Sequence, residues 1–90
     1  MQWVDLTVEK LALFYDQDYG GKKAGRYRIS DKLLRKLANR KRLYENDIQV
    51  LGRALLERGY VLIDLNTFYV VMSANAFTNY RRVSDGQIHE

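Results

Sequence analysis

Cysteine and proline are both missing from the 90-residue sequence. Without cysteine the chain has no disulfides and no thiolate metal ligands. Without proline, no helix or strand is interrupted by a residue that lacks a backbone N–H. Apolar runs are short as well, and none approaches the roughly 18 residues that a membrane-spanning helix needs. We therefore expect a cytoplasmic protein with no membrane partner, stabilised by the packing of its apolar side chains.

Groups that carry chemistry are also scarce. Histidine occurs once, at His89, so it cannot form a metal cluster or a catalytic triad by itself. The glycines and lysines of residues 20–23 lack the spacing of a phosphate-binding loop. Residues 1–5 have neither the basic nor the apolar stretch of a secretory signal. We expect no enzymatic activity, no metal, no cofactor and no small-molecule substrate.

Apolar residues are plentiful, at 47% of the sequence, and they are spread along its whole length. Ninety residues suffice for one domain with one core. We expect a single domain over residues 1–84 and a flexible tail over residues 85–90.

Positive charge is concentrated in one part of the chain. Residues 22–42 contain ten basic residues and one acid, Asp31, which gives this window a net charge of +9 against +4 for the whole sequence. Such a block attracts polyanions, although it can also be a solvated face that only aids solubility.

Three segments have helical periodicity. Over residues 4–17 an apolar stripe recurs every three or four positions, and Asp5 or Thr7 could cap its start. Over residues 31–42, with Ser30 or Asp31 as the cap, apolar and basic side chains take opposite faces. The apolar face holds Leu33, Leu34, Leu37 and Ala38, and the basic face holds Lys32, Arg35, Lys36, Asn39 and Arg40.

The third helix is expected over residues 46–58, capped by Asn46 or Asp47 and ended by Gly59. Its buried arc holds Ile48, Leu51, Ala54 and Leu55, and its exposed arc holds Asn46, Gln49, Val50, Arg53 and Glu57.

Strand patterns flank and follow these helices. Residues 26–29 alternate polar and apolar side chains, and the apolar runs 60–63 and 68–73 form a hairpin around the turn 64–67. Asn66 is the residue expected at positive φ in this turn. Beyond it, Phe77 and Tyr80 are candidates to pack back on the core.

The order helix, short strand, helix, turn, helix, strand, turn, strand resembles the winged helix-turn-helix superfamily. The resemblance covers residues 4–73 and is carried by RYRISDKLLRKLANRKRLYENDIQVLGRALLERGYVLID. It implies an α+β fold of three helices plus a small antiparallel β-hairpin wing. It also implies that the helix over 46–58 enters the major groove of double-stranded DNA.

The resemblance assigns two sets of residues to DNA. Side chains able to pair with base edges or to touch a thymine methyl group are Asn46, Gln49, Val50 and Arg53. Cations placed near phosphates are Arg28, Lys32, Arg35, Lys36, Arg40 and Arg42.

Two features depart from the superfamily pattern. The wing tip, residues 64–67, has no Arg or Lys, and the third helix carries the acids Asp47 and Glu57. The expected function is that of a small transcriptional regulator that binds double-stranded DNA sequence-specifically. The alternatives are a winged-helix protein-interaction module and an RNA-binding domain. A homodimer, formed through the first helix or through Phe77 and Tyr80, is a further expectation because a lone winged helix presents a small DNA interface.

Overall fold

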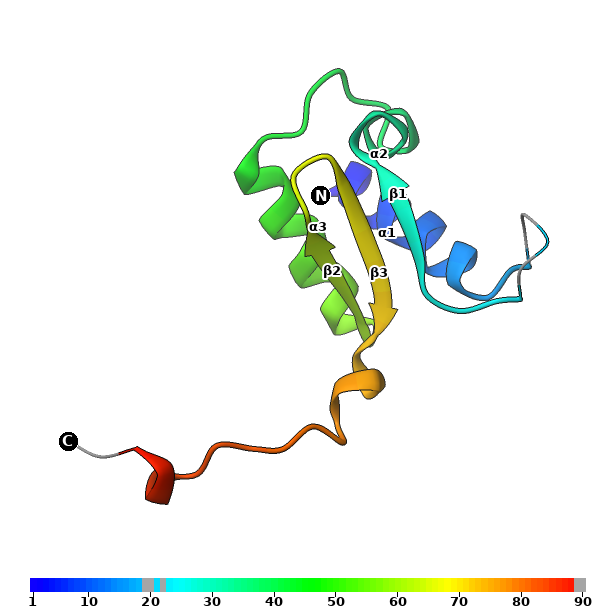
Figure 1. The fold of residues 1–90 in the computed structure, drawn as a ribbon. Helices are drawn as coiled ribbons and strands as arrows, with labels where there is room; N and C mark the ends of the chain where they lie inside the picture. Colours follow the sequence, from blue (N-terminus) through cyan, green and yellow to red (C-terminus); the bar gives the residue numbers. More distant parts are fainter. Residues whose placement is uncertain (19–20, 22, 89–90) are drawn as a thin grey trace.

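The computed structural model describes residues 1–18, 21 and 23–88. Its elements are α1 (Gln2–Tyr15), β1 (Tyr27–Ser30), α2 (Asp31–Leu37), α3 (Glu45–Glu57), β2 (Tyr60–Asp64), β3 (Phe68–Ser73) and the short 3-10 helices η1 (Ala74–Phe77) and η2 (Asp85–Gln87). The fold is α+β, with three α-helices and one three-stranded antiparallel sheet in the described residues (Figure 1). Lys22, which belongs to the basic block 22–42, and His89, the one histidine of the sequence, lie outside the described residues.

The sheet has the strand order β1-β3-β2, with β3 in the centre. Val71 of β3 lies opposite Tyr27 of β1 on one side and opposite Leu62 of β2 on the other. The expected hairpin is confirmed, and β1 pairs as a third strand one residue later than its predicted position. Asn66 has φ 74°, as predicted, and its N–H donates to Asp64 Oδ1 at 2.8 Å, which closes the turn.

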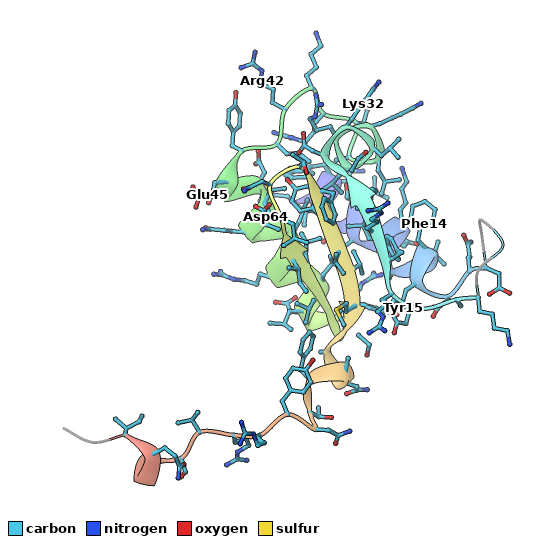
Figure 2. The ribbon with its side chains drawn as sticks, viewed as in Figure 1. Phe14, Tyr15, Lys32, Arg42, Glu45 and Asp64 are labelled. Atoms are coloured by element: carbon cyan, nitrogen blue, oxygen red, sulfur yellow. The ribbon has the colours of Figure 1, made fainter. Side chains whose placement is uncertain are left out.

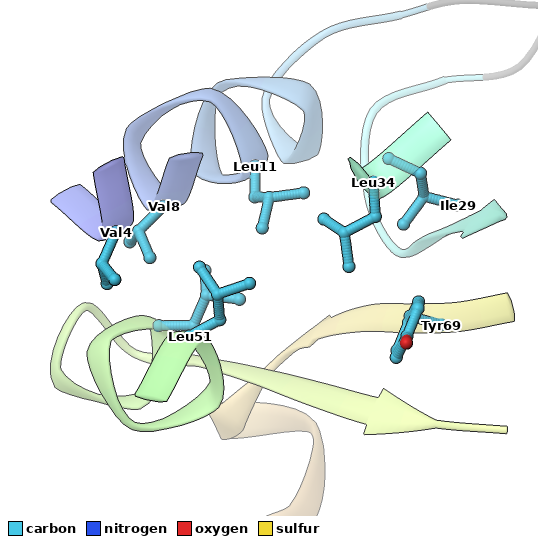
Figure 3. Close-up of a cluster of buried hydrophobic side chains, with 8 residues drawn as sticks. Val4, Val8, Leu11, Ile29, Leu34, Leu51 and Tyr69 are labelled. Atoms are coloured by element: carbon cyan, nitrogen blue, oxygen red, sulfur yellow. The ribbon is translucent and has the colours of Figure 1, made fainter. Parts of the chain in front are cut away.

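Helices α1 and α3 pack against each other and against one face of the sheet (Figure 1). The buried side chains between them come from every α-helix and from two strands (Figure 3). They are Val4, Val8, Leu11, Ile29, Leu34, Leu51, Leu55 and Tyr69. The predicted apolar stripes of α1 and α3 are therefore confirmed as core. Each fully buried leucine contributes about 2 kcal/mol to stability.

The outer face of the sheet is not covered by any helix of the described residues (Figure 1). Because side chains alternate along a strand, Tyr60 and Leu62 face the core while Val61 and Ile63 face outward. Val70, opposite Ile63, also lies on this outer face and is half-buried.

Helix α1 begins two residues earlier than predicted, with Met1 as its N-cap, and neither Asp5 nor Thr7 caps it. Thr7 is instead buried in the core, where its Oγ1 donates to the Trp3 carbonyl at 2.6 Å. This bond within the helix allows a hydroxyl to sit among apolar side chains without an unpaired polar atom.

Helix α2 ends at Leu37, whereas the sequence predicted a helix to residue 42. Asn39 adopts the left-handed conformation, with φ 55°. The N–H of Asn39 donates to Lys36 O at 3.1 Å, and the N–H of Arg40 donates to Arg35 O at 3.0 Å. These two bonds form a Schellman motif, which satisfies the last carbonyls of α2 and turns the chain away. The connection to α3 therefore spans residues 38–44.

The start of α2 agrees with the prediction, since Ser30 Oγ accepts the N–H of Leu33 at 3.2 Å. The core-facing prediction for Leu33 is wrong, because this side chain is 54% exposed. The other predicted core-facing residues of this helix are covered, since Leu34 and Ala38 are buried and Leu37 is half-buried.

Helix α3 begins at Glu45, after Tyr44 as its N-cap. The Asp47 carboxylate caps the helix from inside its first turn, because Oδ2 accepts the Tyr44 N–H at 2.9 Å. Gly59, with φ 89°, follows the last turn, as predicted.

The chain leaves the sheet through η1 and then extends away from the body (Figure 1). Phe77 is half-buried, but Tyr80 is 65% exposed and contacts Phe77 edge-on at 5.4 Å between ring centroids. The sequence offered Phe77 and Tyr80 as residues that pack back on the core, and only Phe77 is half-buried.

Candidate nucleic-acid interface

Apart from Arg40, which contacts an aromatic ring, four exposed cations lie on α2 and on the connection that follows it. We call them the basic loop surface: Lys32, Lys36, Lys41 and Arg42. Lys32 and Arg42 project outward at the same end of the molecule (Figure 2). The described residues form one salt bridge, between Arg35 and Asp31, and none of these four cations takes part in it. Their charges therefore face solvent.

Arg35, predicted to contact phosphate, is instead engaged within the protein. Its Nε lies 3.0 Å from Asp31 Oδ2, and its Nη1 donates to the Lys41 carbonyl at 3.1 Å. Two of its donor nitrogens are thus used, and the side chain is 37% exposed. Arg35 therefore ties helix α2 to the backbone of the connection 38–44, which carries two residues of the basic loop surface.

The Asp31 carboxylate links this arginine to the core. Tyr69, only 4% exposed, donates its hydroxyl to Asp31 Oδ1 at 3.1 Å. Burial raises the pKa of Tyr69 to about 12, and the hydrogen bond to the Asp31 carboxylate acts in the same direction. A chain of contacts thus runs from the central strand through Asp31 and Arg35 to the backbone of Lys41.

Two further predicted phosphate ligands contact aromatic rings. The Arg40 guanidinium lies over Trp3 of α1, 4.3 Å from the ring centroid, and Arg28 lies 5.7 Å from the ring centroid of Phe68. Cation–π contact restrains each side chain but leaves guanidinium N–H donors for other partners. Arg28 points to the outer face of the sheet, away from the core.

Helix α3 presents three of the four predicted base-reading residues on one exposed face. Asn46, Gln49 and Arg53 are exposed and are spaced three and four residues apart. Val50 is half-buried and packs against the core cluster, so its predicted place on the exposed arc is wrong. The opposite arc, with Leu51 and Leu55, is fully buried.

Two carboxylates near this region accept hydrogen bonds from the backbone. Asp47 caps α3, and Asp64 closes the hairpin turn. Glu45, in the first turn of α3, is exposed and complements the helix dipole.

The sequence placed Lys41 only within the basic block, and it favoured packing over base stacking for most of the seven tyrosines, Tyr44 among them. The structure exposes both, Tyr44 to 61%, in the connection between α2 and α3. For Tyr44 the signal was the interruption of helical periodicity at residues 43–46, which places its side chain outside any core-facing stripe.

No family model, curated protein or solved structure matches the chain. In the part of the chain that the structure describes, no three His, Asp or Glu side chains are grouped so as to hold a metal ion. Within the same residues, every helix is too short or too polar to cross a membrane.

Proposed function

We propose that this protein is a winged helix-turn-helix domain that binds double-stranded DNA sequence-specifically and regulates transcription. The observation that carries the proposal is the basic loop surface, whose four exposed cations follow one another on α2 and the connection 38–44 and form no salt bridge with any described acid. Such a cluster suits a row of phosphates, since each cation that pairs with a phosphate releases a condensed counterion.

The arrangement of α3 supports the same proposal. The element order and the pairing of β1 with β3 agree with the expected wing, and the buried arc of α3 leaves Gln49 and Arg53 facing outward. An arginine and a glutamine one turn apart can reach the same groove and pair with guanine and adenine.

A second candidate function, a protein-interaction module, is favoured by three other features. The connection 38–44 is longer than the three to four residues of a typical helix-turn-helix. The wing tip also lacks a basic residue, and Glu45 places a negative charge at the start of α3.

Salt dependence of DNA affinity tests the proposal. Log affinity for duplex DNA is measured against log salt for the wild type and for a variant with all four residues of the basic loop surface changed to Gln. We expect the variant to bind every duplex more weakly. Its slope should be flatter by about 0.9 for each phosphate that no longer pairs with a cation of the protein.

The matched control removes the same charge elsewhere, through Lys23→Gln, Arg26→Gln, Arg81→Gln and Arg82→Gln. A control variant that loses as much affinity and slope as the first would show that only net charge matters. Absence of binding by the wild type at low salt would refute DNA binding and leave the protein-interaction module.

Selection of bound sequences from a random duplex pool tests specificity. We expect one enriched motif, and a palindromic motif would indicate that a two-fold dimer binds. A pool that remains random after selection would contradict sequence-specific recognition.

A further inference from the structure

A groove with an apolar floor lies between α1, β1 and α2, outside the base-reading face of α3. Its volume is about 520 Å³, within the range of roughly 300–1,000 Å³ typical of small-molecule sites. The apolar walls include Phe14 of α1 and Leu33 and Leu37 of α2.

The charge at the rim of this groove has one sign. Lys10 of α1 and Lys36 of α2 line it, together with Arg28 of β1, and none of the described Asp or Glu residues does. The Arg28 guanidinium is shared with Phe68 on the outer face of the sheet, so the two lysines are the principal cationic partners for a ligand.

Leu33 gives this groove an uncovered apolar wall. It is 54% exposed, although its neighbour Leu34 is fully buried. A ligand chain lying along Leu33 would remove apolar surface from water, and an anionic head at Lys10 or Lys36 would keep its charge in a favourable field.

We propose that this groove binds a small amphipathic anion, namely a fatty-acid-like carboxylate. Its hydrocarbon chain lies against Phe14, Leu33 and Leu37, and its carboxylate pairs with Lys10 and Lys36. The proposal rests on shape, burial and charge, and it does not depend on DNA binding.

The test is a titration of the full chain with decanoate, kept below its micelle concentration and followed by amide chemical shifts and calorimetry. We expect saturable binding with shifts concentrated on α1, β1 and α2. Two probes separate the contributions of chain and charge: butyrate has the carboxylate with little chain, and decylammonium has the chain with the opposite charge. Both should bind at least about fivefold more weakly than decanoate.

Two pairs of variants locate the site. Leu33→Gln and Lys36→Gln should each weaken decanoate binding at least about fivefold. Leu56→Gln and Arg58→Gln make the same kinds of change on exposed residues of α3 and its C-cap, and should leave the affinity unchanged.

Three results would overturn the proposal. The first is no saturable binding of decanoate, and the second is equal affinity for decylammonium. The third is a dimer, seen by sedimentation, that Leu33→Gln dissociates, because the groove would then be an interface between copies of this chain.

Discussion

Tyr69→Phe removes the single hydroxyl that connects the central strand to the Asp31–Arg35 pair. The ring stays in place, so no cavity forms, and the loss is confined to the hydrogen bond of 3.1 Å to Asp31 Oδ1. Hydrogen bonds to charged groups contribute about 1.5–3 kcal/mol. Because Asp31 is 37% exposed and water can replace the hydroxyl, we expect a loss near the lower end, about 1.5 kcal/mol at pH 7.

The same variant makes a pH-dependent prediction. The pKa of Tyr69 is raised from 10.0 to about 12 in the folded protein, so the folded state favours the protonated hydroxyl. The stability from this group is fully present below pH 10 and is lost as the pH rises from 10 to about 12. The wild type should lose roughly 1 kcal/mol relative to Tyr69→Phe by about pH 11.

Urea unfolding at pH 7, 10 and 11 measures both effects. The control is Tyr60→Phe, a half-buried ring that contacts Tyr15 edge-on at 5.1 Å. We expect its change to stay within about 0.5 kcal/mol at each pH. Equal stability of Tyr69→Phe and wild type at pH 7, or a difference that is constant from pH 7 to 11, would refute this reasoning.

Three further predictions concern recognition, the core and the end of α2. Arg53→Ala should cost about 1–3 kcal/mol on the selected DNA site and much less on random duplexes, and an equal loss on both would contradict base reading. Leu55→Ala, in the fully buried arc of α3, should cost about 2–5 kcal/mol in urea unfolding, whereas Leu56→Ala at the surface should stay within about 0.5 kcal/mol. Asn39→Val should cost about 1–2 kcal/mol because a β-branched residue is strained at φ 55°, and Asn39→Gly, the control, should retain wild-type stability.

The core was predictable because its signals are local and periodic. Val4, Val8 and Leu11 recur at helical spacing, and the change to alternating and β-branched residues after Gly59 marks the hairpin. Asn66 could also be predicted as the turn residue, since few side chains tolerate positive φ.

The end of α2 was not predictable from the same signals. Apolar and basic residues continue in helical register past Leu37, and only the left-handed conformation of Asn39 ends the helix. Two Schellman bonds accompany that conformation, and the next residue, Arg40, contacts Trp3, which is distant in the sequence.

The site was harder to predict because charge alone does not reveal whether a cation already has a partner. Arg35 and Lys36 are adjacent and basic, yet one binds Asp31 and the Lys41 carbonyl while the other faces solvent. The partner of Asp31, Tyr69, lies 38 positions away and is brought close only by the sheet.

The restraints on residues 38–44 have a thermodynamic consequence for association. Asn39, Arg40, Lys41 and Tyr44 are each fixed by a backbone or side-chain contact, so the connection is ordered before any partner arrives. A partner that contacts it pays little conformational entropy for ordering the backbone. Its binding should therefore lack the large negative heat-capacity change that accompanies coupled folding, and most of its affinity should vary with ionic strength.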